Sequence, residues 1–259
     1  MRLRRTLMLW AWLLPALASA APAREDVQFI ACPAYRDTDA GRKSGCWLAT
    51  SRVDGLRYDI TRSPTKPDWN HAVLVEGQVA EGAADTCGGI VLDPVRVSVL
   101  PDACPRMMLP AQGAPGVRFG LPRRNVRPPH EAREIYTKGS EPKLIQVPFD
   151  YGNDFTIYQL ADYYMQQATL FAQDTSPSRI EVVGYAATTP WTVAGRVLQE
   201  DPALARARAE RVALWLRLTG VDPDIIEVRV GSEDKVVPME GADGLREPSR
   251  RRVDVILHP

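Results

Sequence analysis

The sequence is poor in the residues from which catalytic and metal centres are usually built. Its 259 residues include only three histidines, His71, His130 and His258, and no nucleophile, zinc-protease or phosphate-loop motif. The segment 37–41 has the aspartate spacing that opens a calcium loop, but Leu48 stands where that loop needs a glutamate. We therefore expect a protein that is not an enzyme and that needs no cofactor or metal.

The chain also lacks an excess of positive charge, with 32 basic and 32 acidic side chains. Residues 1–20 combine three arginines, an apolar run over 7–17 and small residues ending at Ala20, which is typical of a secretory signal peptide. We expect cleavage after Ala20; an uncleaved membrane anchor is the alternative. Cleavage would leave 29 basic against 32 acidic side chains, a balance that argues against nucleic-acid binding.

No later apolar run is long enough to cross a bilayer, and residue 21 is not a cysteine that could carry a lipid. The sequence therefore predicts an exported protein without a transmembrane span after cleavage. We expect it in the periplasm or on the periplasmic face of the outer membrane.

Cysteine is absent from the C-terminal half. The four cysteines are Cys32, Cys46, Cys87 and Cys104, and an even number in an exported chain predicts disulfides. Three pairings are possible; we favour Cys32–Cys46 and Cys87–Cys104, since each closes a short loop. A zinc site is the alternative, but the spacing is unlike that of zinc ligands.

Composition divides the mature chain into three parts. Residues 21–104 contain short alternating apolar runs bounded by glycine, proline and aspartate, which predicts a small disulfide-stapled β domain. Residues 105–143 are rich in proline and predict an extended interdomain linker. Residues 144–259 form the third part.

Periodicity in residues 144–259 predicts an α+β domain in the order βαβαββ. A strand over 145–151 should lie at a sheet edge because it contains Pro148. Asn153 or Asp154 should cap a first helix that Pro177 ends, and a second helix should span about 201–219. With strands near 180, 226–230 and 253–257, the pattern predicts two helices on one face of a four-stranded sheet.

Three motifs in this region occur in a recognisable order. They are a strand ending at Gly184, a helix containing Arg208-Ala209-x-x-Val212, and the late segment Arg250-Arg251-Arg252-Val253. Together they resemble the OmpA-like periplasmic domain, which holds bacterial envelope proteins onto peptidoglycan. In that family an aspartate and the helix arginine grip the zwitterionic end of a diaminopimelate residue in the stem peptide. The resemblance implies that Arg208 binds the carboxylate of this ligand by a bidentate fork.

The chain departs from the family pattern in the loop before the second helix. Ala187 occupies the aspartate position, and extra residues separate Gly184 from Arg208. Asp201, at the helix start, could supply the missing carboxylate. The candidate ligand-binding residues are Arg208, Thr188, Thr189, Asp201 and Arg251.

Each candidate also has an ordinary structural interpretation. Arg208 could pair with an internal acid or a strand-end carbonyl. Arg251 and Arg252 could be surface charges on an edge strand. Trp191, in the lengthened loop, could stack on a ligand or pack against its own domain.

Three functions remain open from the sequence. The first is a non-enzymatic cell-envelope protein whose OmpA-like domain associates with the peptidoglycan stem peptide, with an envelope protein bound by the N-terminal β domain. The second is a degenerate OmpA-like module with a structural or oligomerising role. The third places an enzymatic or inhibitory activity in the β domain.

Overall fold

The structure is a computed structural model that describes residues 26–37, 45–83, 87–111, 133, 135–232 and 234–259. The expected signal peptide with its cleavage after Ala20 lies outside the described residues, as do His130 and most of the proline-rich segment. No helix of the described residues is long and apolar enough to cross a membrane.

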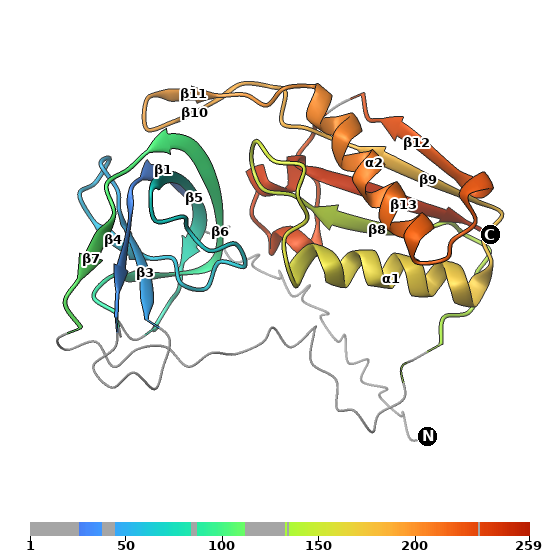
Figure 1. Ribbon diagram of the computed structural model, residues 1–259, viewed down its shortest axis with the longest axis horizontal. Helices are drawn as coiled ribbons and strands as arrows, with labels where there is room; N and C mark the ends of the chain where they lie inside the picture. The colour runs from blue at the N-terminus through green and yellow to red at the C-terminus, as the bar shows by residue number, and fades with distance from the viewer. Residues whose placement is uncertain (1–25, 38–44, 84–86, 112–132, 134, 233) are drawn as a thin grey trace, which may run out of the picture.

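The N-terminal part is a seven-stranded sheet in the order β1-β5-β6-β4-β3-β2-β7 (Figure 1). Its strands are β1 (Val27–Ala31), β2 (Pro33–Arg36), β3 (Cys46–Thr50), β4 (Arg57–Asp59), β5 (His71–Val79), β6 (Ile90–Ala103) and β7 (Met107–Leu109). The last strand pairs with β2, so the sheet continues past residue 104 into the segment expected to be linker.

The long antiparallel pair of β5 and β6 is covered on both faces. Successive side chains of a strand point to opposite faces. One face carries Val73, Val75, Val95 and Val97, which pack into the domain's own core. The other face carries Ala72, Leu74 and Leu100, which pack against residues of the C-terminal half, and two charged residues treated below. The β5–β6 pair therefore serves as both core and domain interface.

The disulfides join residues far apart in the sequence, so the favoured local pairing was wrong. The bridges are Cys32–Cys104 and Cys46–Cys87, with Cα atoms 5.6 and 6.0 Å apart. In the β2–β3 hairpin, Cys46 lies opposite Arg36. Cys32 lies four positions before Arg36 along the extended chain, which places the two cysteines about 13 Å apart along the hairpin. The favoured Cys32–Cys46 bridge is therefore excluded by the register of the strands.

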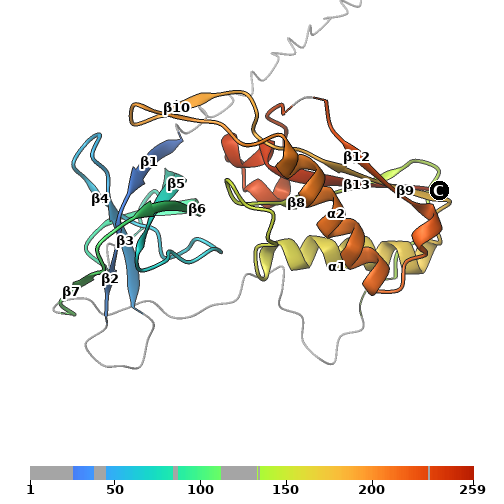
Figure 2. The same cartoon turned by 45° about the horizontal axis from the view of Figure 1, so that its top comes forward.

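The C-terminal part is the expected two-layer α+β domain. Its elements are β8 (Lys143–Pro148), α1 (Leu160–Thr175), β9 (Arg179–Gly184), α2 (Ala203–Leu218), β12 (Ile226–Val230) and β13 (Arg252–His258). The sheet order is β12-β9-β13-β8, with β8 at an edge as Pro148 predicted. Both helices contribute to one apolar core with the sheet, and Figures 1 and 2 show them on the same side of it. Three short 3₁₀ turns, η2 (Pro223–Ile225), η3 (Glu240–Ala242) and η4 (Glu247–Arg250), complete the connections.

The predicted cap of the first helix was wrong. Neither Asn153 nor Asp154 caps α1, which begins only at Leu160. The side chain of Asn153 instead accepts a hydrogen bond from the amide of Phe155 in a turn, and Asp154 pairs with Arg211 at 2.9 Å. The polar residues that favoured a cap are used by the loop that precedes the helix.

The strand β13 is not an edge strand. It lies between β9 and β8 and pairs with both. Arg251 and Arg252 are 1% and 4% exposed, so their interpretation as surface charges was wrong.

The extra residues before α2 form a hairpin that the sequence pattern did not predict. It consists of β10 (Trp191–Val193) and β11 (Arg196–Leu198), and it extends over the N-terminal sheet (Figure 1). Val193 and Leu198 pack in one cluster with Ala72, Leu74 and Leu100. The insertion therefore helps to dock the two domains.

Candidate functional site

Arg208 lies on α2 and is completely buried. Its Nε donates to the carbonyl of Asn153 at 2.8 Å, Nη1 to that of Tyr185 at 3.0 Å, and Nη2 to that of Asp150 at 3.0 Å. The same two terminal nitrogens grip the carboxylate of Glu200 at 2.9 and 2.6 Å. A guanidinium has five N–H groups, and these five contacts use all of them.

Glu200 is equally enclosed. Besides the two bonds from Arg208, its carboxylate accepts the amides of Gly152 and Ala187, both at 2.7 Å. Burial alone would raise the pKa of Glu200, but the hydrogen bonds and the positive charge of Arg208 hold it below the usual value. The pair is therefore an ionised, fully hydrogen-bonded unit inside the domain.

The hairpin insertion before α2 places the carboxylate of Glu200 beside Arg208. Glu200 donates its amide to the carbonyl of Ala187 at 2.9 Å, and Ala187 returns its own amide to the Glu200 carboxylate. The loop between them closes at its base, and Glu200 projects back into the domain. Ala187, where the sequence pattern led us to expect an aspartate, thus lies beside a carboxylate from thirteen residues later in the chain.

Close packing between strand and helix fixes the position of Arg208. A Cβ atom on Gly184 would lie 1.8 Å from the carbonyl oxygen of Ala205, so only glycine fits where β9 meets α2. Ala205 is itself buried. This contact brings the first turns of α2 against the end of β9, where Arg208 reaches the carbonyl of Tyr185.

The other candidates in the insertion do not reach Arg208. Asp201 accepts the amide of Ala203 at the start of α2, and Glu200, its neighbour, supplies the carboxylate instead. Glu200 follows Leu198 by two residues, and both are buried. This alternation was the available signal, but without the hairpin it had no obvious meaning.

Thr188 and Thr189 connect the insertion to the loop before β13. Thr189 donates both its amide and its hydroxyl to Asp234, each at 2.8 Å. Asp234 also pairs with Arg250 at 2.5 Å, and Arg250 donates to the carbonyl of Thr189. Thr188 donates its amide to the carbonyl of Ala186, and its carbonyl accepts a hydrogen bond from the side chain of Gln199.

Arg251 is buried in the domain interface. Its two terminal nitrogens donate to Glu76 of β5 at 3.2 and 2.5 Å, and both side chains are 1% exposed. Burial raises the pKa of Glu76, and the charge of Arg251 opposes that rise. The structure thus separates two candidates that the sequence grouped: Arg208 is held within its own domain, and Arg251 by the other domain.

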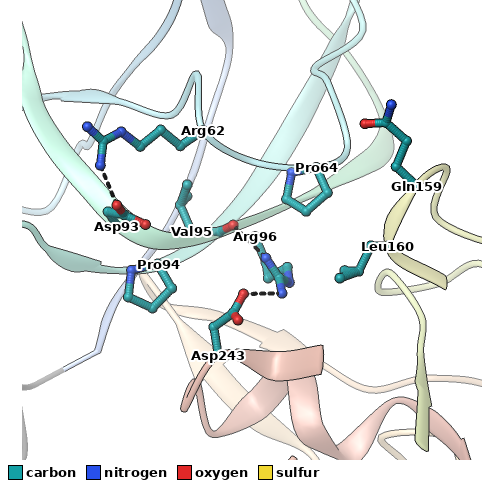
Figure 3. Close-up of a pocket in the computed structure, with 9 residues that line it drawn as sticks. All are labelled: Arg62, Pro64, Asp93, Pro94, Val95, Arg96, Gln159, Leu160 and Asp243. Atoms are coloured by element: carbon teal, nitrogen blue, oxygen red, sulfur yellow. Dashed lines mark hydrogen bonds and ion pairs between the residues drawn. The ribbon is translucent and has the colours of Figure 1, made fainter. Parts of the chain in front are cut away.

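A cleft of about 380 Å³ lies between the domains, with Arg96 on one side and Asp243 on the other (Figure 3). Its charged lining residues pair with one another, Arg62 with Asp93 and Arg96 with Asp243. The charges of the cleft are therefore balanced by its own side chains.

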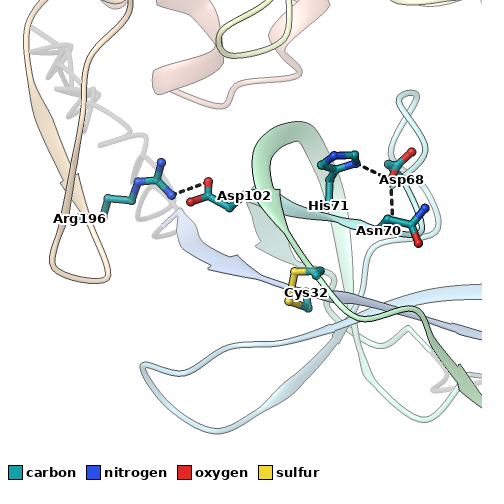
Figure 4. Close-up of a disulfide and its surroundings, with 7 residues drawn as sticks. Cys32, Asp68, Asn70, His71, Asp102 and Arg196 are labelled. Atoms are coloured by element: carbon teal, nitrogen blue, oxygen red, sulfur yellow. Dashed lines mark hydrogen bonds and ion pairs between the residues drawn. A yellow bond between two sulfur atoms is a disulfide. The ribbon is translucent and has the colours of Figure 1, made fainter.

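The N-terminal domain shows one partnered histidine near a disulfide. His71 Nδ1 lies 2.7 Å from Asp68 Oδ1, close to the bridge of Cys32, where Asp102 pairs with Arg196 of the hairpin (Figure 4). Elsewhere in the described part of this domain, Cys46, Asp59 and Cys87 approach as metal ligands would. The two sulfurs are bonded to each other, so they are not thiolate ligands.

Comparison with known proteins concerns the C-terminal half. No protein-family model matches the chain, and no curated protein matches it. Among solved structures, the OmpA-like domain of FopA1 from Francisella tularensis is 20% identical, over 47% of this chain and 77% of that one, with a TM-score of 0.36. The periplasmic domain of MotB from Helicobacter pylori is also 20% identical, over 47% and 78%, with a TM-score of 0.33.

The peptidoglycan-associated lipoprotein from Burkholderia pseudomallei is 24% identical, over 43% of this chain and 88% of that one, with a TM-score of 0.32. The predicted resemblance of the C-terminal half to OmpA-like domains therefore has counterparts among solved structures. At these identities and TM-scores the similarity concerns the fold and decides nothing about a ligand.

Proposed function

We propose that this protein is a non-enzymatic cell-envelope protein whose OmpA-like domain is a structural module rather than an open receptor for a stem peptide. One observation carries the proposal: every N–H group of Arg208 is already bonded inside the protein, and the side chain has no exposed surface. A site of this kind holds the loop, the insertion and α2 together.

The energetics favour the state in which Glu200 stays bonded to Arg208. An external carboxylate would have to displace Glu200 and leave that buried carboxylate without its cation. Breaking a buried ion pair by removing one partner costs about 3–5 kcal/mol. A ligand would have to recover this free energy before it showed any net affinity.

Peptidoglycan association through Arg208 is the second candidate. It is favoured by the way in which Arg208 holds Glu200, because the bidentate fork is the geometry expected for a ligand carboxylate. The structural neighbours include a protein named as peptidoglycan-associated and another described as a cell wall anchor. In this second proposal Glu200 occupies the site until a ligand replaces it.

The N-terminal β domain would supply contacts to an envelope partner. Tyr35, Trp47 and Trp69 form a partly exposed aromatic cluster with ring centroids 4.8–5.1 Å apart. The guanidinium of Arg106 lies 4.3 Å from the centre of the Trp69 ring. Aromatic residues and arginine are enriched at protein interfaces, which supports a protein partner. In this proposal the protein is exported to the periplasm, where it meets that partner.

Sedimentation with purified peptidoglycan tests these proposals. The structural proposal expects that wild type does not sediment, or that it sediments equally well after Arg208→Ala in a variant whose circular dichroism shows that it is folded. Glu200→Gln keeps the shape of the side chain and removes its charge. Sedimentation gained in Glu200→Gln, or lost in folded Arg208→Ala, would contradict the structural proposal and favour the second candidate.

A further inference from the structure

Two oppositely charged residues face each other in the N-terminal sheet without forming a pair. Glu76 of β5 and Arg96 of β6 are direct partners in the antiparallel register. Residues in such positions have Cβ atoms about 4.5–5.5 Å apart and point to the same face, where opposite charges normally attract each other. Both are buried here, at 1% and 5% exposure.

Each of them binds the C-terminal domain instead. The carboxylate of Glu76 accepts hydrogen bonds from both terminal nitrogens of Arg251. Arg96 donates to the carbonyl of Gly241 at 2.6 Å and to the carboxylate of Asp243 at 2.5 Å. The sheet pair is therefore split, and each half finds a partner of opposite charge across the domain interface.

We propose that the domains dock reversibly by exchanging ion-pair partners, and that undocking uncovers Arg251 as a binding site for a carboxylate group. In the docked state Glu76 and Arg96 each pair across the interface, Glu76 with Arg251 and Arg96 with Asp243. In the undocked state they pair with each other on the face of the β5–β6 sheet, so the N-terminal domain keeps its charges compensated.

This exchange of partners lowers the free-energy cost of separating the two domains. Separation of buried charges is costly when each is left without a partner. Asp243 is already one-third exposed and can be hydrated after separation. The apolar part of the contact, in which the hairpin residues Val193 and Leu198 meet Leu74, then acts as the main attraction that keeps the domains docked.

Undocking removes the carboxylate that is hydrogen-bonded to Arg251, whereas Asp150 and Glu200 of its own domain act on Arg251 through their charges. Among the described residues its side chain donates only to Glu76, and its Nε has no hydrogen-bond partner. A guanidinium whose two terminal nitrogens are both available can bind a carboxylate through two parallel hydrogen bonds. The ligand class is therefore a carboxylate, which would compete with Glu76 and hold the domains apart.

Amide hydrogen exchange on the full mature chain, followed by NMR, measures docking directly. The amide of Tyr151 donates to Ser98 Oγ, and that of Arg246 to Asp26 Oδ2, so both are bonded across the interface. The amide of Phe149 donates to the carbonyl of Arg251 within the C-terminal domain. Exchange of Tyr151 and Arg246 together, and faster than Phe149, is the expected result. Equal rates for all three amides would mean that docking is lost only on unfolding and would overturn the proposal.

Variants distinguish partner exchange from general loosening. Asp243→Asn removes one docked partner and leaves the Glu76–Arg96 pair available, so exchange at Tyr151 and Arg246 should rise about tenfold. Glu76→Gln leaves Arg251 buried without a carboxylate, so the rise should be about a hundredfold or more. Asp102→Asn, which breaks an exposed interdomain pair with Arg196, is the matched control and should change the rates less than about twofold. Equal effects of all three variants would refute the exchange of buried partners.

Acetate is the probe for the uncovered arginine, with sodium chloride at the same ionic strength as its control. Acetate should accelerate exchange at Tyr151 and Arg246 several-fold more than chloride does in wild type, and Phe149 should not respond. In Arg251→Gln the two salts should act alike, whatever the baseline rate of that variant. An acetate effect that persists in Arg251→Gln, or that is missing in wild type, would overturn the carboxylate site. These readouts do not involve peptidoglycan, so they stand apart from the sedimentation result.

Discussion

Two of the buried arginines of the C-terminal domain have the same chemistry and opposite consequences. Arg208 and Arg251 each grip a glutamate with both terminal nitrogens. The partner of Arg208 comes from its own domain and three backbone carbonyls complete its shell. The partner of Arg251 comes from the other domain, and in the part of the chain that the structure describes the Nε of Arg251 has no hydrogen-bond partner. The first arginine is therefore part of a domain's internal structure, and the second is part of a contact between domains.

The largest expected effect is at the internal site. Arg208→Ala would leave Glu200 buried without its cation and three carbonyls without a donor. We expect a loss of about 3–5 kcal/mol in the free energy of unfolding. Urea denaturation of the mature protein measures it, with Arg206→Ala as control because Arg206 is exposed and only weakly paired with Glu210. A loss below about 1 kcal/mol would mean that the pair contributes little to the fold.

A somewhat smaller loss is expected when a second carboxylate enters the same site. Ala187 is fully buried and bonded to Glu200, so Ala187→Asp would place like charges side by side. We expect a loss of about 2–4 kcal/mol in unfolding free energy rather than a gain in ligand binding. Ala187→Ser separates the effect of charge from that of added volume. A stable Ala187→Asp variant with a new affinity for peptidoglycan would show that the site can open.

The interface should respond to pH in the opposite sense to the internal pair. Burial raises the pKa of Asp150 from 3.8 to about 6, against the hydrogen bond from Thr65 and the charge of Arg251. The folded protein then binds this proton more tightly than the unfolded chain does, so stability should rise as pH falls from 7 to about 5. The raised pKa of Glu76 acts in the same sense.

The lowered pKa of Glu200 acts the other way, and its contribution is lost only as pH falls below its usual value of 4.5. Urea denaturation at pH 7, 6 and 5 measures the difference. Asp150→Asn should flatten the rise between pH 7 and 5. An unchanged slope in Asp150→Asn would assign the pH dependence to other groups.

How far the sequence predicts the molecule depends on the range of the interactions. Period-two and helical apolar patterns are local, and they located the four strands and two helices of the C-terminal domain, including the edge position of β8. The same patterns located α2 and so placed Arg208 on a helix. Interactions between distant residues were missed, because no local signal reports them. The pairing of Cys32 with Cys104, 72 residues apart, depends on the order of strands in the sheet.

Two glutamates that bind the candidate arginines were missed for a related reason. Glu76 is the one acidic residue in a largely apolar strand, and nothing near it in the sequence indicates a partner 175 residues later. Glu200 was overlooked in favour of its neighbour Asp201, because the hairpin that turns Glu200 inward has strands of only three residues each. Both glutamates are acids at positions where strand alternation predicts burial. That conflict between local pattern and charge is the signal that could have identified them.

The smallest expected effect concerns the exposed link between the domains. Arg196 of the hairpin pairs with Asp102 at 2.8 Å, but the two side chains are 44% and 45% exposed. Exposed pairs contribute about 0–1 kcal/mol and are weakened by salt. Arg196→Gln should therefore lower the unfolding free energy by no more than about 0.5 kcal/mol, and 0.5 M sodium chloride should remove the difference. A double-mutant cycle of Arg196→Gln with Asp102→Asn measures the coupling. A coupling comparable to that between Arg251 and Glu76 would mean that burial does not distinguish the two interdomain pairs, and that the hairpin tip holds the domains together as strongly as their buried centre.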